Sequence, residues 1–142
     1  MFGVTAWDVS AFGLMVGAGL GLAALINPRW AAKLVKLEEA APGGASEFRA
    51  TYGGLFFAVH AAAWMLIKLY WGSDNAAMSA VALGGCTVLA AGWAGSCFGR
   101  IVSFVLDKTA TKFMLASAAF EAAMALIIAA PWFYWVAGAL FR

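Results

Sequence analysis

Four long stretches of mostly apolar residues occupy most of the sequence and limit what it can fold into. They run over residues about 6–27, 49–71, 76–106 and 112–138. A hydrocarbon layer about 30 Å thick requires roughly 20 apolar residues of helix, and each stretch meets that length. The composition agrees, because only 11% of the 142 residues are charged, against about 25% in soluble domains. We therefore predict an all-α fold, a single transmembrane domain over residues 1–142 built as a four-helix bundle.

The segment between the first two stretches has the pattern of a short helix lying on the membrane surface. Pro28 favours a helix start, since proline is tolerated at the first helical position. The predicted helix covers residues about 28–41, with lysine and arginine beside an apolar stripe. Pro42-Gly43-Gly44 ends it, and Ser46 is the expected N-cap of the second span. The stripe consists of Trp30, Leu34, Leu37 and Ala41.

The distribution of lysine and arginine predicts the orientation. Cytoplasmic loops of membrane proteins are enriched in these residues. Seven of the nine lie after the first span or around the end of the third, and only Lys68 and Arg142 lie on the opposite side. Both termini are therefore expected outside, where tryptophan and tyrosine also gather at the span ends. The seven are Arg29, Lys33, Lys36, Arg49, Arg100, Lys108 and Lys112.

Two charged residues lie inside apolar runs, and their positions predict an ion pair. Arg100 lies nine residues before Thr109, in the third connection, and Glu121 lies twelve residues after it. In antiparallel helices that rise about 1.5 Å per residue, the two side chains are at similar depth, within roughly 5 Å. Intramembrane charges usually face the protein interior and pair. The pair would fix the register of these spans or would be a polar anchor for a ligand.

A second group of polar residues opens the second span. Glu47 is expected at the helix N-terminus, where negative charge is favoured by the helix dipole. Arg49 starts near the same boundary as Arg100, and Tyr52 follows one turn later. These residues would either join Arg100 and Glu121 in one polar network or lie at the interface with their charges in the headgroup layer.

His60 is the only histidine, and it falls near the middle of the second span. Together with Trp64 it is a candidate for ligand contact, although a lone histidine among small residues is more often a packing residue. A zinc site is not expected, because no paired Cys or His occurs at usable spacing. No catalytic residue is predicted, since nothing resembles a nucleophile elbow.

Glycines at four-residue spacing predict close helix packing. Gly13, Gly17 and Gly21 form two consecutive steps in the first span, and Gly95 and Gly99 form one in the third. Small residues at this spacing let helices approach closely. The first-span glycines would face either the bundle or a second protein.

The motif E-x-R-A-x-Y-G-G stands at Glu47–Gly54, with Gly99-Arg100, Asp107 and Phe120-Glu121 further along. With these motifs the chain resembles small four-span bacterial inner-membrane proteins grouped as a domain of unknown function. The resemblance covers nearly the whole chain. It implies a four-helix membrane domain in the bacterial cytoplasmic membrane and implies no activity.

Three functions are compatible with the sequence. The preferred one is a non-enzymatic membrane protein, either an accessory subunit or a binder of a quinone, carotenoid or lipid. The second is a small proton-coupled transporter using Glu121 and His60, and the third is a membrane enzyme on an isoprenoid-like substrate with an acid or base at these residues.

The expected partners are membrane lipids, with a lipophilic small molecule, a second copy or a membrane complex as further candidates. A net charge of +2 is too small to indicate nucleic acid binding. The sequence points to no particular cofactor.

Overall fold

The computed structural model describes residues 4–37, 43–73 and 75–140, with side chains to residue 138, and the described part is all-helical. Three helical stretches are long and apolar enough to cross a membrane, or four if a bent helix pair counts as one span. The elements in chain order are α1 (Ala6–Ile26), α2 (Pro28–Val35), α3 (Gly44–Phe48), η1 (Arg49–Leu55), α4 (Phe56–Trp71), α5 (Ala76–Leu106), α6 (Lys112–Ile128) and α7 (Ala130–Leu140).

Short polar side chains begin most of these helices. Thr5 forms a capping box with Asp8 at the start of α1. The side chains of Asn27, Asn75 and Thr111 accept hydrogen bonds from backbone N–H groups in the first turns of α2, α5 and α6. The first N–H groups of a helix have no partner within the helix, so these contacts satisfy them.

The second span begins earlier than predicted. Residues Gly44–Trp71 form one continuous helical stretch, made of α3, the π-helical turns of η1 and α4. The prediction that Ser46 caps this span was wrong, because Ser46 lies inside α3 and Gly43 precedes the helix. In a π-helix each hydrogen bond spans five residues, whereas in an α-helix it spans four. Such segments are rare and frequently lie at functional sites.

The predicted surface helix is shorter than expected. It ends at Val35, where Lys36 adopts a left-handed backbone conformation with φ 58°. Leu37 lies beyond the helix, and the rest of the predicted segment, residues 38–41, falls outside the described residues.

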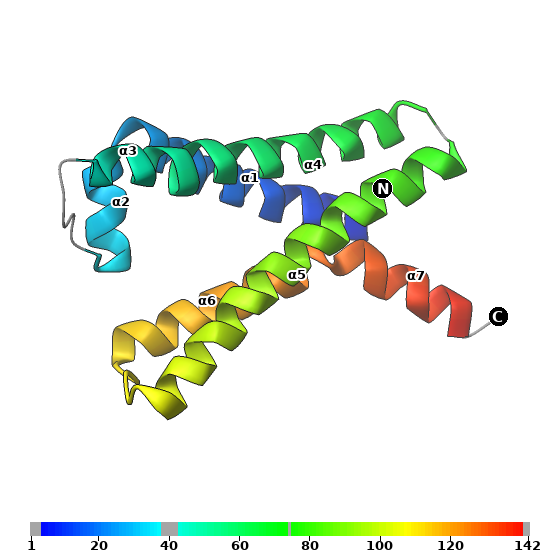
Figure 1. Ribbon diagram of the computed structural model, residues 1–142. Helices are drawn as coiled ribbons and strands as arrows, with labels where there is room; N and C mark the ends of the chain where they lie inside the picture. Colours follow the sequence, from blue (N-terminus) through cyan, green and yellow to red (C-terminus); the bar gives the residue numbers. More distant parts are fainter. Residues whose placement is uncertain (1–3, 38–42, 74, 141–142) are drawn as a thin grey trace.

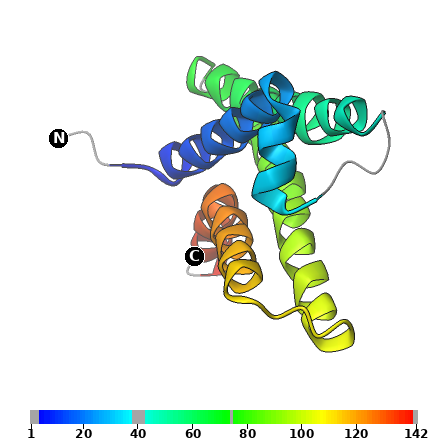
Figure 2. The ribbon, with the colours of Figure 1, turned by 90° about the vertical axis from the view of Figure 1, so that its left-hand side faces the viewer.

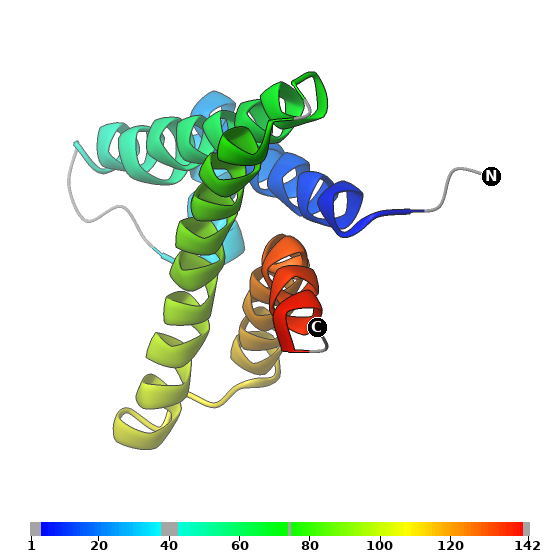
Figure 3. The same cartoon turned by 90° about the vertical axis from the view of Figure 1, so that its right-hand side faces the viewer.

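The long helices form two antiparallel pairs that cross (Figure 1). One pair is α1 with η1 and α4, and the other is α5 with α6 (Figure 3). The pairs converge near the middle of the molecule and diverge towards the end that carries α2 and the α5–α6 turn. Figure 2 shows α2 between the end of α1 and the α5–α6 pair. The described helices share a core at the crossing but do not close into a bundle along their whole length.

The core at the crossing is built from side chains of all four long helices. Leu14, Ile67 and Ile128 are fully buried there, together with the small residues Ala82 and Cys86. Burial of a Leu or Ile side chain contributes about 1.5–3 kcal/mol relative to exposure in water. In lipid, where exposed apolar surface costs little, close packing replaces this term as the main source of association.

The glycines of α1 allow this close packing. A Cβ at Gly13 would lie 2.7 Å from the Ile127 side chain, and a Cβ at Gly17 would overlap the His60 ring. At Gly21 it would overlap the backbone of Phe57, which has no freedom to move aside. The α1 glycines therefore pack within the chain.

The prediction for the α5 glycines was wrong within this chain. No atom lies within 4 Å of the position where Gly95 or Gly99 would carry a Cβ. Gly53, which was not assigned a packing role, has a close contact instead: a Cβ there would lie 2.8 Å from the Leu25 backbone.

The fourth span is bent by 50° between α6 and α7. Pro131 lies just past the break and cannot donate a backbone hydrogen bond. Because Pro131 has no N–H, it gives no helical hydrogen bond to the carbonyl four residues earlier, that of Ile127. In the structure, the hydroxyl of Ser10 on α1 donates to the neighbouring carbonyl of Ile128 at 2.8 Å. The bent position is thus tied to α1 by a fully buried side chain.

The contact between α1 and α4 predicts that alanine substitutions at two glycines of α1 change the free energy of unfolding very differently. Gly21→Ala should lower the free energy of unfolding by about 1–3 kcal/mol, because the added methyl group meets backbone. Gly19→Ala is the control, since nothing lies within 4 Å of that position, and it should be neutral or stabilising by up to about 1 kcal/mol. Thermal unfolding in one detergent measures both. Equal melting temperatures for the two variants would contradict the packing.

The hydrogen bond at the bend predicts that removal of the Ser10 hydroxyl lowers the free energy of unfolding. Ser10→Ala should destabilise the protein by about 1–3 kcal/mol, because the buried carbonyl of Ile128 loses its partner. Ser79→Ala is the control, since that hydroxyl bonds to a carbonyl in its own exposed turn. Chemical unfolding followed by circular dichroism compares the two, and a Ser10→Ala protein as stable as the control would refute the role of the hydroxyl.

Candidate functional site

A large cavity lies where the two helix pairs diverge. Its volume is about 1050 Å³, and α1, α2, η1, α4, α5 and α6 all contribute to its walls. Most lining side chains are apolar or aromatic, and Arg100 and Glu121 are the only lining residues with a formal charge. A hydrophobic cavity with a few polar groups is the usual form of a small-molecule site.

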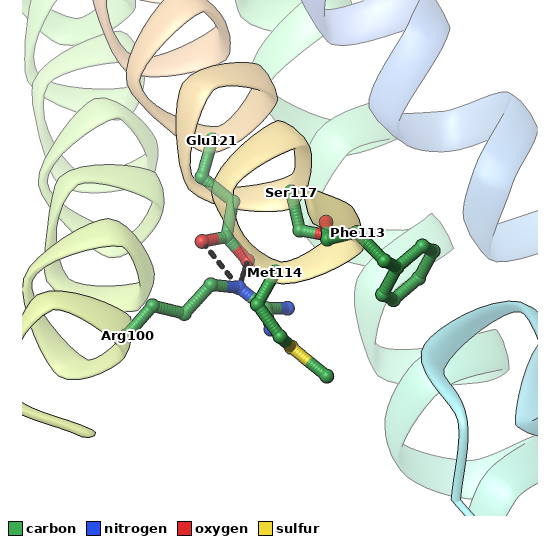
Figure 4. A network of polar contacts seen from close by, with 5 residues as sticks. All are labelled: Arg100, Phe113, Met114, Ser117 and Glu121. Atoms are coloured by element: carbon green, nitrogen blue, oxygen red, sulfur yellow. Dashed lines mark hydrogen bonds and ion pairs between the residues drawn. The ribbon is translucent and has the colours of Figure 1, made fainter. Parts of the chain in front are cut away.

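The predicted ion pair between Arg100 and Glu121 is present and forms part of the cavity wall (Figure 4). The Nε–H of Arg100 is 2.8 Å from both carboxylate oxygens of Glu121. The side chain of Glu121 is 10% exposed and that of Arg100 is 30% exposed. The pair joins α5 to α6, so it fixes the register of these two helices and also presents a polar group to the cavity.

The outer part of the guanidinium extends past the carboxylate. Its Nη1 lies 3.4 Å from the sulfur of Met114, a weak acceptor. Ser117, on the same helix, donates its hydroxyl to the Phe113 carbonyl at 3.0 Å and also lines the cavity. Figure 4 shows Glu121 and Met114 beside the arginine, whereas the Phe113 ring projects away from it.

His60 and Trp93 form the inner wall. His60 Nδ1 is 2.7 Å from the carbonyl of Phe56, and the indole N–H of Trp93 donates to His60 Nε2 at 3.1 Å. Since Nε2 accepts a hydrogen bond, the imidazole is neutral and Nδ1 carries its proton. Phe56 and Phe120 pack with their rings 5.3 Å and 5.7 Å from the Trp93 ring. His60 is thus a fully bonded packing residue at the edge of the cavity.

The second predicted polar cluster is not joined to the ion pair. Arg49 donates from Nε to the carbonyl of Leu25 at 3.2 Å. That carbonyl belongs to the last turn of α1, where carbonyls lack helical partners and a cation is favoured by the helix dipole. Tyr52 lines the cavity but stacks on Phe48 with ring centroids 4.6 Å apart. Glu47 is exposed in the first turn of α3. Of the two alternatives, the single five-residue network is not formed among the described contacts.

Trp64 does not line the main cavity. It belongs to a separate groove of about 290 Å³ between α1 and α4, with Gly19 and Phe57 among its neighbours. Trp93, on α5, takes the place expected for Trp64 beside His60 and near Glu121. The sequence carried a signal for this: Trp93, Ser96, Arg100 and Ser103 follow one helical stripe of α5, and all four line the cavity.

Helix α2 forms part of the cavity wall. Trp30 and Leu34, which belong to the apolar stripe predicted for a surface helix, line the cavity and are also exposed. The ammonium of Lys36 lies 4.3 Å from the centre of the Phe113 ring, so the end of α2 contacts α6. A cation over an aromatic face contributes about 0.5–1 kcal/mol at exposed sites. The apolar stripe of α2 is thus a wall of the cavity.

The ion pair predicts a coupling between Arg100 and Glu121. Arg100→Met and Glu121→Leu should each destabilise the protein, because each leaves one charge without its partner at membrane depth. The double variant should be more stable than the sum of the two losses predicts, by about 1–3 kcal/mol, with the lower end favoured by the partial exposure of Arg100. A double-mutant cycle of unfolding free energies measures this term, and strict additivity would refute the coupling.

The comparisons with known proteins point to one family. No curated protein and no solved structure gives a significant match to the chain. A family model described as a domain of unknown function, DUF4345, matches residues 9–136. This range contains both helix pairs, the ion pair and every residue that lines the cavity. The chain therefore belongs to the DUF4345 family.

Proposed function

We propose that this protein is a non-enzymatic membrane protein that binds a lipophilic small molecule in the cavity between its two helix pairs. The observation that carries the proposal is the cavity itself, about 1050 Å³ in volume and lined largely by apolar side chains. Ligand pockets for drug-sized molecules have volumes of about 300–1,000 Å³. A cavity at the top of this range suits a lipid-like or polycyclic molecule.

The walls support binding more than chemistry. The two lining groups that titrate as acid or base, Glu121 and His60, are both held by hydrogen bonds from other side chains of the wall. Trp93 and Phe120 supply flat aromatic faces, which bind apolar rings and chains with little loss of side-chain freedom. These features favour the ligand-binding hypothesis over the transporter and the enzyme.

We further propose the membrane topology that the basic residues indicate. The segments rich in lysine and arginine, residues 28–37 and 107–112, lie at the same end of the molecule, where the two helix pairs diverge (Figure 1). Under the positive-inside rule this end faces the cytoplasm of a bacterial inner membrane, and both termini lie on the periplasmic side. The cavity then opens towards the cytoplasmic leaflet. In this setting the two helix pairs would form the predicted four-helix domain.

The proposal predicts that the occupancy of a bound organic molecule falls when the space beside α5 is filled. Gly92 lines the cavity and has open space beside it, so Gly92→Phe places a ring inside. Protein purified in mild detergent should carry an apolar molecule detectable by mass spectrometry. Gly92→Phe should lower its occupancy about tenfold, since overpacking costs about 1–3 kcal/mol.

Gly95→Phe is the matched control for this measurement. Gly95 lies on the same helix with the same open surroundings but is not part of the cavity wall. Its occupancy should stay at the wild-type value. Absence of any bound organic molecule in the wild type, together with no uptake of an added apolar probe, would refute the function. Equal loss in both variants would refute the location.

A further inference from the structure

The guanidinium of Arg100 has donors that the described protein does not use. An arginine side chain carries five N–H donors. Glu121 receives only the Nε–H, shared between its two oxygens, and Nη1 has only the sulfur of Met114 beside it. No oxygen acceptor among the described residues lies within hydrogen-bond distance of the two Nη groups. The Arg100 side chain is 30% exposed, and no buried side-chain nitrogen among the described residues lacks a partner, so the Nη groups are accessible to an acceptor from outside the protein.

Arg100 is a lining residue of the cavity. Arg100 lines it together with Ser96 and Ser103 of α5 and Ser117 of α6. The two Nη groups of an arginine present parallel N–H bonds, which match the two oxygens of a carboxylate or phosphate. An acceptor of this kind would satisfy the donors without disturbing the bond from Nε to Glu121.

One further cation lies beside the wall near Arg100. Glu121 already balances Arg100, so the ion pair itself is neutral. The ammonium of Lys36 lies over Phe113, a lining residue one position before Met114. Lys36 follows Arg29 and Lys33 in the sequence and is followed by Glu38 and Glu39. Lys36 is therefore the described cation that would attract a negative head group to this part of the wall.

The rest of the cavity is suited to an apolar tail. From Arg100 to Trp93 the cavity follows two turns of α5, about 10 Å along the axis. Over this length the wall is formed by Phe120 and Phe56 on the facing helices, and it ends at the His60–Trp93 pair. A molecule with its head at Arg100 would place a chain of several carbon atoms along this wall.

We infer that the ligand is a long-chain amphiphile with an oxyanion head group, a carboxylate or a phosphate, whose oxygens accept from the two Nη groups of Arg100. This inference rests on the proposed function and specifies the class of ligand. A free fatty acid and an anionic phospholipid share this chemistry, and the experiment separates them.

The test compares two probes that differ only in the head group. Dibromostearic acid and dibromostearyl alcohol quench tryptophan fluorescence on contact, and Trp93 and Trp30 both line the cavity. The full-length protein is titrated with each probe in a neutral detergent, at an alkaline pH where the acid is ionised. The wild type should bind the acid at least about tenfold more tightly than the alcohol, because hydrogen bonds to charged groups are the strong ones.

The outcomes separate this inference from the proposed function. Equal binding of acid and alcohol would overturn the oxyanion head group while leaving a lipophilic site. Quenching by neither probe would refute the site itself. Brominated phosphatidic acid and phosphatidylcholine form the second arm: stronger binding of phosphatidic acid than of the fatty acid identifies a phospholipid, and the reverse identifies a free fatty acid. Either order, with the neutral members weaker, supports the oxyanion class.

Two variants test the assignment to Arg100. Arg100→Gln/Glu121→Gln removes both charges with side chains of similar size, so the ratio of acid to alcohol affinity should fall to about one. Arg100→Lys keeps a single cation for Glu121 and loses the forked donor edge, so it should also lose most of the preference. Gly95→Phe is the control and should keep it. A preference that survives in both arginine variants would overturn the assignment.

Discussion

The close approach of α1 to the second span is the constraint on which the rest of the structure depends. At Gly21 and Gly53 the backbone of the other helix leaves no room for a methyl group, and at Gly17 the ring of His60 leaves none. Two helices held this tightly act as one rigid unit. The second unit, α5 with α6, can then contact the first only near the crossing, where Leu14, Ile67 and Ile128 are buried. The space beyond the crossing is the cavity.

The two pairs are held by different interactions, and this difference shapes the site. Small residues and apolar packing hold α1 against α4, whereas α5 and α6 have a charged contact in addition. An ion pair at this depth costs desolvation and gives little net stability, but it disfavours every register in which one charge lacks its partner. The pair therefore specifies one alignment of α5 and α6. The same alignment brings the outer edge of the guanidinium to the cavity wall.

The sequence predicts those features that depend on distance along the chain. Apolar length located the membrane-crossing helices to within a few residues, except for the early start at Gly44. Counting from the α5–α6 turn placed Arg100 beside Glu121, because both helices are regular over that distance. The expectation of a family of unknown function agrees with the match over residues 9–136.

Features that depend on how helices cross could not be predicted in this way. A glycine pair shows that one face of a helix is flat but not whether another helix covers it, so Gly95 and Gly99 were assigned contacts that they lack. Trp64 and Trp93 both lie near the middle of their predicted spans. Which of them lines the main cavity depends on how the two helix pairs cross. Arg49 was grouped with the other charges because the end of α1, where its partner carbonyl lies, is 24 residues away in sequence.

The 50° bend after α6 also affects how the protein fits a bilayer. Helices α6 and α7 together hold 28 residues, which would reach about 42 Å if straight, whereas the bend reduces the reach along α6 to about 36 Å. The antiparallel neighbour α5 has no such bend and is about 46 Å long. Hydrophobic mismatch of this size is relieved by tilting the longer helix. The kink thus shortens the span formed by α6 and α7, so the longer α5 is the helix of this pair that is expected to tilt in a bilayer.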